Sequence, residues 1–219
     1  MSVTIYINFI MSSISEISQA IKIKFDSKDS AREQALKLSR EVIRLSGNAI
    51  RAIHRKEYNR ANELLQDEKS ILDNIKSILE NHKDIYYAGF VEDAQQEYAE
   101  AILLYSIITK ENTANLNTLP DPEEIEVEYA PYLKGLGDLV GELRRHILDL
   151  IRRDKEEDGE NFLELMEDIY TILMHFDYPD AITHGLRRKV DIARSIIERT
   201  RGDLTNAIQC KKLMTAILQ

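Results

Sequence analysis

The sequence predicts an all-α protein, a bundle of seven amphipathic helices. Glycine (8 residues), proline (4 residues) and aromatic residues (7%) are sparse among the 219 residues. Charged residues make up 31% and hydrophobic residues 43%, a balance that favours long helices over a sheet protein or a disordered chain. Apolar residues recur at spacings of three and four along most of the chain, whereas no segment shows the alternation of a strand.

The N-terminal region is expected to contain two helices with a break between them. The first spans residues 13–25, and residues 26–30 offer several N-capping side chains that would end it and begin the next helix. Residues 1–12 form an apolar extension, which we expect to be unstructured or, if translation starts at Met11, mostly absent. This extension has no basic leader and is too short to span a bilayer.

The next helix has the clearest pattern in the chain. Its apolar residues alternate spacings of three and four and so share one face: Ala35, Leu38, Val42, Leu45, Ala49 and Ala52. Such a face needs partner helices, and periodic runs over residues 58–79 and 91–110 supply them. Residues 112–131 contain three of the four prolines and an acidic run, which predicts a solvated connection.

Three further helices are expected in the C-terminal half. Periodicity returns over residues 132–153 and 162–175, with a polar turn at 154–160 between them. A last helix is expected over residues 180–213, because Pro179 suits its first turn. Neither half can bury its apolar faces alone, so residues 13–219 are expected to form a single domain.

Net charge and cysteine content narrow the range of functions. A formal net charge of -9 is unlike that of a protein that coats nucleic acid with its whole surface, so any nucleic-acid site must be a local patch. Cys210 is the only cysteine, which excludes a disulfide framework and a cluster of thiolate metal ligands. We expect a cytoplasmic protein with no membrane segment.

Two pairs of acids lie in apolar stretches of the sequence. Glu97 and Glu100 are three residues apart, and Asp138 and Glu142 are four apart, so each pair shares a helix face. Like charges at these spacings cost a helix a few tenths of a kcal/mol, and more when partly buried, unless a cation or a proton compensates them. A bound divalent cation would provide this compensation.

Glycines surround the second acid pair. Gly135, Gly137 and Gly141 each cost a helix about 1 kcal/mol relative to alanine, which suggests that another backbone or a ligand approaches closely. If the two acidic helices face each other, their four carboxylates form an all-oxygen site suited to Mg²⁺, or Mn²⁺, rather than zinc. The alternative is that these acids are merely solvated or paired, as we expect for several others: Asp67, Glu68, Glu156, Glu157 and Asp158.

Basic residues form two stripes, each on one helix face. The first basic stripe lies within an arc of about 60°, largely opposite the apolar face: Lys37, Arg40, Arg44, Arg51 and Arg55. The second basic stripe repeats every seven residues on the last helix: Arg187, Arg194 and Arg201. Such stripes suit a phosphate backbone without reading bases, although ordinary exposed helix faces can look the same. His54, His146 and His175 are expected to be packing or surface residues, and only His146, four residues after Glu142, is placed to matter.

Several segments, taken in order over about residues 30–210, resemble TRAX-type members of the translin superfamily. They are Lys37-Leu38-Ser39-Arg40 with His54-Arg55, Gln96-Glu97-Tyr98 with Glu100-Ala101, and Tyr132-Leu133 with Gly135, Asp138-Leu139 and Gly141-Glu142-Leu143. The chain lacks a long insertion of some TRAX proteins and any basic cluster of the nuclear-localisation kind. It is therefore similar to a compact archaeal or prokaryotic form.

This resemblance implies a seven-helix fold, a hollow oligomer that binds single-stranded RNA or DNA on its inner wall, and Mg²⁺-dependent endoribonuclease activity. It also implies that the catalytic acids are Glu97, Glu100, Asp138 and Glu142, the first three of which are basic or apolar in translin itself. The chain would act as a homo-oligomer or together with a translin-like subunit. Two alternatives stay open: a non-catalytic nucleic-acid-binding scaffold, and a helical regulator that binds no RNA.

Overall fold

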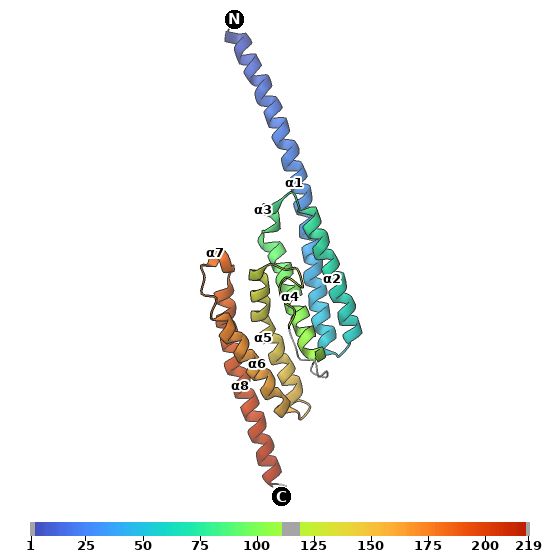
Figure 1. The fold of residues 1–219 in the computed structure, drawn as a ribbon, viewed down its shortest axis with the longest axis vertical. Coiled ribbons are helices and arrows are strands. Elements are labelled where there is room, and N and C mark those ends of the chain that lie inside the picture. Colours follow the sequence, from blue (N-terminus) through green and yellow to red (C-terminus); the bar gives the residue numbers. More distant parts are fainter. Residues whose placement is uncertain (1–2, 111–118, 218–219) are drawn as a thin grey trace.

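The computed structural model, which describes residues 3–110 and 119–217, consists of helices joined by turns and one longer loop (Figure 1). The N-terminal half contains α1 (Val3–His54), α2 (Tyr58–Ile78), α3 (Lys83–Tyr86) and α4 (Gly89–Lys110). The C-terminal half contains α5 (Tyr129–Ile151), α6 (Glu156–Leu173), α7 (Asp180–Thr183) and α8 (Leu186–Ile217). No strand occurs in these described ranges, and the all-α prediction is confirmed.

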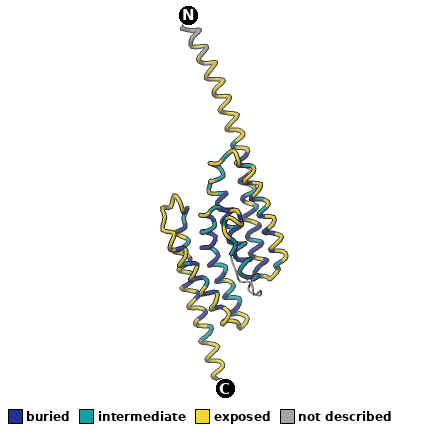
Figure 2. Tube along the Cα trace, viewed as in Figure 1, coloured by how far each residue is buried: buried dark blue, intermediate teal, exposed yellow. Residues whose placement is uncertain are grey.

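The first helix is much longer than expected. Residues 26–30 lie inside α1, so the predicted break is wrong, and the predicted unstructured extension is helical from Val3 onward. The physical reason is that capping residues alone do not end a helix, and residues 1–46 contain no glycine or proline. Residues 10–27 of α1 are exposed and project beyond the rest of the molecule (Figures 1 and 2).

Two boundaries in the C-terminal half also differ from the prediction. Helix α6 begins at Glu156, inside the expected turn, because a left-handed residue at Asp154 (φ 57°) already reverses the chain. The expected last helix is divided into α7 and α8 by left-handed backbone at His184 (φ 46°) and Gly185 (φ 88°). The Gly185 amide donates to Asp180 Oδ1 at 2.7 Å, which closes the turn between the two helices.

Two groups of three helices share one core. Helix α1 packs against α2 and α4, while α5 packs against α6 and α8, and the groups meet where α4 contacts α5. Large side chains from this central pair are fully buried, among them Leu103, Leu104, Leu139, Leu143 and Ile147. Within the described parts of the chain, no helix is long and apolar enough to cross a membrane.

The connection between α4 and α5 is less solvated than predicted. Residues 111–118 lie outside the described residues, but in the segment that follows Ile125 and Val127 are buried. The Tyr132 hydroxyl donates to the Pro120 carbonyl at 2.9 Å and ties the loop to the first turns of α5. The loop therefore covers part of the core, because its alternate apolar side chains have a surface to pack on.

Two of the acids expected to be solvated are buried. Glu68 is completely inaccessible, and burial raises its pKa to about 8, so its carboxyl group is neutral at pH 7. Its Oε2 lies 2.5 Å from Ser46 Oγ, which also lies 3.1 Å from the Val42 carbonyl. A protonated Glu68 explains both contacts, since it can donate to Ser46 while Ser46 donates to Val42. Glu156 is 4% exposed and pairs with Lys211 at 2.6 Å.

The sequence predicts that another part of the protein approaches the glycines of α5 closely, and the structure shows this for two of the three glycines. A Cβ at Gly135 would lie 3.0 Å from the Gln96 carbonyl oxygen, in the backbone of α4. A Cβ at Gly137 would lie 3.0 Å from Lys189 Cβ on α8, whereas at Gly141 the nearest atom is 3.9 Å away. Gly135 therefore allows α4 and α5 to pack backbone to backbone.

Replacing Gly135 with alanine should lower the free energy of unfolding by about 1–3 kcal/mol, because the α4 backbone cannot yield to the added methyl group. Gly141→Ala is the matched control on the same helix and should stabilise the protein by up to about 1 kcal/mol through helix propensity. Urea unfolding curves of both variants test this. Equal midpoints for the two variants would contradict the tight α4–α5 contact.

Candidate functional site

The four predicted acids converge where α4 meets α5. Glu97 and Glu100 lie on α4, and Asp138 and Glu142 lie on α5; we call these four residues the carboxylate cluster. Burial, followed by the negative charge of Asp138, raises the pKa of Glu97 and raises that of Glu100 to about 9. Burial is the larger cause of both shifts, and the charges of the other acids add to it, so the four acids act on one another electrostatically.

Asp138 is held by two side chains that the sequence did not single out. Lys189 Nζ on α8 lies 2.7 Å from both carboxylate oxygens of Asp138, and Gln96 Nε2 on α4 donates to Oδ2 at 2.6 Å. The positive charge of Lys189 also favours the ionised forms of Glu97 and Glu100, but burial and the acids outweigh it. Lys189 is therefore the main counter-charge of the cluster.

Glu142 has a different environment from Glu100. His54 Nε2 on α1 lies 2.6 Å from Glu142 Oε2, and Arg145 Nη1 lies 3.6 Å from the same oxygen. Burial raises the pKa of Glu142, but the hydrogen bond from His54 and the charges of His54 and Arg145 lower it more, to a net value below the ordinary one. Glu142 is thus ionised at neutral pH, whereas Glu100 holds a proton unless another cation arrives.

The expectation that His146 is the only histidine placed to matter is wrong. His146 packs edge-on against Phe162 with ring centroids 4.6 Å apart, and burial lowers its pKa to about 4, so it is neutral at pH 7. The histidine that contacts the cluster is His54, whose side chain is 4% exposed. Spacing within one helix could not reveal this contact, because His54 lies 88 residues before Glu142.

The donor atoms of the cluster suit a hard divalent cation. It offers only carboxylate oxygens, the ligands that Mg²⁺ and Mn²⁺ prefer, and the pKa values of Glu97 and Glu100 are raised first by burial and then by the neighbouring acids. In this structure, however, no three acidic, histidine or cysteine side chains among the described residues lie close enough together to hold an ion. Lys189 and His54 engage Asp138 and Glu142 instead, so a cation would have to displace these contacts.

The first basic stripe ends next to the histidine that contacts the cluster, because Arg51 lies one turn before His54 on α1 and Arg55 directly follows the end of this helix. All five of its side chains are exposed: Lys37, Arg40, Arg44, Arg51 and Arg55. Arg44 pairs with Glu41 at 2.9 Å, and Arg51 donates to Asn48 at 2.5 Å. Most of the stripe's charge is therefore available to a phosphate backbone.

The second basic stripe is less positive than predicted. Its residues Arg187, Arg194 and Arg201 are exposed, but Arg201 pairs with Glu167 of α6 at 2.6 Å and Arg194 with Glu198 at 3.3 Å. These partners come from a neighbouring helix and from the next turn of α8. Only Arg187 of this stripe makes no ion pair within the described part of the chain.

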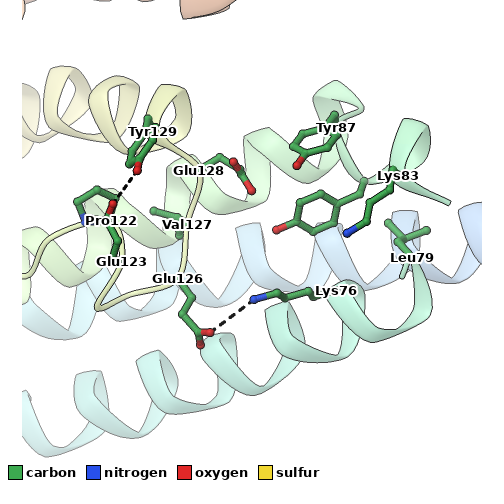
Figure 3. Close-up of a pocket in the computed structure, with 11 residues that line it drawn as sticks. Lys76, Leu79, Lys83, Tyr87, Pro122, Glu123, Glu126, Val127, Glu128 and Tyr129 are labelled. Carbon is green, nitrogen blue, oxygen red and sulfur yellow. Dashed lines mark hydrogen bonds and ion pairs between the residues drawn. The ribbon is translucent and has the colours of Figure 1, made fainter. Parts of the chain in front are cut away.

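One cavity, of about 380 Å³, lies apart from these residues, between α2, α3 and the segment before α5 (Figure 3). Much of its charge is already paired. Lys76 Nζ lies 3.5 Å from Glu126, and the Tyr129 hydroxyl donates to Glu123 at 2.7 Å. None of the four acids and no residue of either stripe lines it, so it is not the candidate site.

A comparison with known protein families shows which family the chain belongs to. The model of the translin family matches residues 30–200. The chain belongs to the translin family. This match covers the carboxylate cluster and the first basic stripe, and it leaves out the projecting part of α1 and the end of α8.

Individual relatives agree with this assignment. An uncharacterized protein of Methanocaldococcus jannaschii is 35% identical over 209 residues, which are 95% of this chain and 90% of the relative. The structure of AfC3PO in complex with duplex RNA is similar with a TM-score of 0.76 and 33% identity, over 88% of this chain and 96% of that one. AfC3PO alone gives 0.75 and 34%, over 88% and 97%. Apo-NeC3PO, at 22% identity and a TM-score of 0.76 over 86% and 96%, shows the shared fold alone.

Replacing Glu100 with glutamine should stabilise the metal-free protein at neutral and alkaline pH. The pKa of Glu100 rises from an ordinary 4.5 to about 9 on folding, so the folded state binds a proton that the unfolded state lacks, and stability falls as pH rises through this interval. The variant escapes this loss, and its melting temperature at pH 7 in a chelator should exceed that of the wild type by several degrees.

The same measurement at about pH 4 should show little difference between Glu100→Gln and the wild type. At this pH the Glu100 carboxyl group is mostly protonated in both the folded and the unfolded protein. Glu164→Gln, an exposed acid of α6, is the control and should leave the melting temperature nearly unchanged at both pH values. A Glu100→Gln variant less stable than the wild type at pH 7 would show that the carboxylate is compensated.

Proposed function

We propose that this translin-family chain is a TRAX-like, Mg²⁺-dependent endonuclease subunit that cleaves single-stranded RNA inside a hollow oligomer in the cytoplasm. The observation that supports it best is the convergence of Glu97, Glu100, Asp138 and Glu142 in a partly buried site. Burying like charges is costly, and a site for a divalent cation is one reason to retain them. Mn²⁺ would suit the same oxygen donors as Mg²⁺.

The chain's own residues divide the chemistry between them. Glu97, Glu100 and Asp138 would hold the cation, which supplies activation of water and neutralisation of phosphate charge when bound. Glu142 is ionised and its Oε2 is engaged by His54, so its Oε1 is available to accept the proton of the attacking water. Hydrolysis of this kind leaves a 5'-phosphate and a 3'-hydroxyl.

RNA binding is supported by the first basic stripe and by a relative. The stripe ends at Arg51 and Arg55, next in sequence to His54, which contacts Glu142, and its exposed side chains suit phosphates irrespective of base sequence. AfC3PO, which is 33% identical, has been solved as a complex with duplex RNA. We therefore propose RNA as the main ligand here, with single-stranded DNA as a further one.

Assembly is part of the proposal. Large apolar side chains of α1 are exposed along its projecting part, where no helix of the same chain covers them: Ile7, Ile10, Ile14, Ile17 and Ile21. Exposed apolar patches of this kind usually mark an interface between proteins. A homo-oligomer is the simplest assembly, and a hetero-oligomer with a translin-like subunit is the alternative.

A non-catalytic RNA-binding scaffold is the second candidate function. The observation that favours it is the pairing of Asp138 with Lys189 and of Glu142 with His54, which resembles a set of structural ion pairs. The two candidates differ in one simple assay. The purified chain should cleave labelled RNA with Mg²⁺ and not with a chelator if it is the enzyme.

Replacing Asp138 with asparagine should reduce RNA cleavage by at least about a hundredfold, because the change keeps the shape of the side chain but removes a charge needed to hold the cation. RNA binding in a chelator should persist, since a negative charge near phosphate has been removed. Single-turnover cleavage and fluorescence anisotropy measure the two effects. Asp168→Asn on the exposed face of α6 is the control and should cleave at the wild-type rate.

A cleavage rate of Asp138→Asn equal to that of the wild type would show that the carboxylate cluster is not the active site. A wild type that is inactive with both Mg²⁺ and Mn²⁺ would favour the scaffold, unless a translin-like subunit restored cleavage. Melting curves of the variant show whether any loss of activity follows from unfolding.

Replacing Arg51 and Arg55 together with alanine should weaken RNA binding to the same extent for all base sequences. Each lost phosphate contact should reduce the slope of log affinity against log salt by about 0.7 for a single strand, so the double variant should show a slope reduced by up to about 1.4. Arg60→Ala, an exposed arginine of α2 that pairs with Glu63 at 3.1 Å, is the control. Unchanged affinity and slope would place the RNA path elsewhere.

A further inference from the structure

A second, smaller cavity lies at the end of the bundle, beside the histidine that contacts Glu142. It has a volume of about 170 Å³ and lies where the turn between α1 and α2 meets the turn between α5 and α6. Its polar lining comes from His54, Lys56, Tyr58, His146, Asp149, Arg153 and Lys155. We call it the end cavity.

The end cavity is positively charged in an acidic protein. Lys56, Arg153 and Lys155 line it, and the one acid in its wall, Asp149, already pairs with Arg152 at 3.2 Å. The charges of Lys56 and Arg153 also contribute, after burial, to the low pKa of His146 in the same wall. The chain has a net charge of -9, so such a local excess of positive charge indicates an anionic ligand.

The three basic residues of the end cavity lie on two tight turns. Lys56 is left-handed (φ 64°), and its amide donates to the Ile53 carbonyl at 2.9 Å. In the other turn the Arg153 and Lys155 amides donate to the Leu150 carbonyl at 2.9 and 3.0 Å. Both turns are therefore fixed by backbone hydrogen bonds, so the three basic residues start from ordered backbone beside the cavity.

The floor of the end cavity is apolar. Ile53, Ile108 and Leu150 line it, and all three are buried. Charges beside an apolar surface are screened less by water, so an anion seated here interacts more strongly with the cations than it would on an open surface. A small, strongly charged group fits these conditions better than a neutral ligand.

His54 connects the end cavity to the carboxylate cluster. It lines the cavity and, through Nε2, contacts Glu142 at 2.6 Å. A phosphate in the end cavity would therefore lie next to the proposed site of cleavage. A strand with its end in this cavity would pass the carboxylate cluster within its first nucleotides.

We propose that the end cavity binds the terminal phosphate of an RNA strand. A phosphate monoester at a strand end carries about 1.5 to 2 negative charges at neutral pH, more than the single charge of a phosphate within the strand. Three cations in a small cavity match the monoester. That the phosphate belongs to RNA rests on the proposed function, whereas the binding of a phosphate monoester does not.

The first experiment compares three short single-stranded RNAs of one sequence, with a 5'-phosphate, a 3'-phosphate or neither. Fluorescence anisotropy with the full chain in a chelator measures binding without cleavage. One of the phosphorylated RNAs should bind about tenfold more tightly than the RNA without a terminal phosphate, as expected for charge-assisted hydrogen bonds. Equal affinity for all three RNAs would overturn the proposal.

The double variant Lys56→Gln, Arg153→Gln should bind all three RNAs alike. Both side chains are exposed, so the fold should survive, and melting curves check this. The matched control, Arg60→Gln with Arg199→Gln, removes the same charge from exposed positions outside the cavity and should keep the preference. A preference that persists in the first double variant would also overturn the proposal.

Inorganic phosphate separates this inference from the proposed function. Millimolar phosphate should raise the melting temperature of the wild type and of the control, but not that of Lys56→Gln, Arg153→Gln. Equal effects on all three proteins would overturn the phosphate site, whether or not the chain cleaves RNA. A selective effect without RNA binding would confirm the phosphate site and refute its assignment to an RNA end.

Discussion

The contact between α4 and α5 at Gly135 is the constraint on which the rest of the structure depends. A side chain at this position would meet the Gln96 carbonyl oxygen at 3.0 Å, so only glycine allows the two backbones to approach this closely. The two three-helix groups meet along this pair of helices. The same contact brings Glu100 of α4 close to Asp138 of α5, at an electrostatic cost visible in the raised pKa of Glu100.

Basic side chains of the flanking helices offset this cost. Lys189 on α8 contacts Asp138, and His54 on α1 contacts Glu142, so each of the two three-helix groups contributes one basic side chain. In the proposed enzyme these contacts would keep the site folded while no cation is bound, and a divalent cation would compete with Lys189 for Asp138. The balance between the two would set how tightly the cation binds.

The fold could be predicted from the sequence wherever apolar periodicity dominates. The helices of the core follow the three-and-four spacing, and the loop before α5 contains Pro120 and Pro122. The prediction was wrong where local signals compete: α1 continues through residues 26–30 because no helix-breaking residue lies there. It was also wrong for Glu68, whose burial depends on packing between α1, α2 and α4 and leaves no trace in the local sequence.

The sequence by itself determined the all-α class, the family resemblance and the pairing of acids on two helix faces, because these properties depend on residues a few positions apart. Only the tertiary structure decided which side chains surround those acids. Lys189 lies 51 residues from Asp138 and His54 lies 88 residues from Glu142, and no local pattern encodes contacts over such separations. The end cavity has the same origin, since two turns that are distant in the chain meet only when α1 and α5 pack around α4.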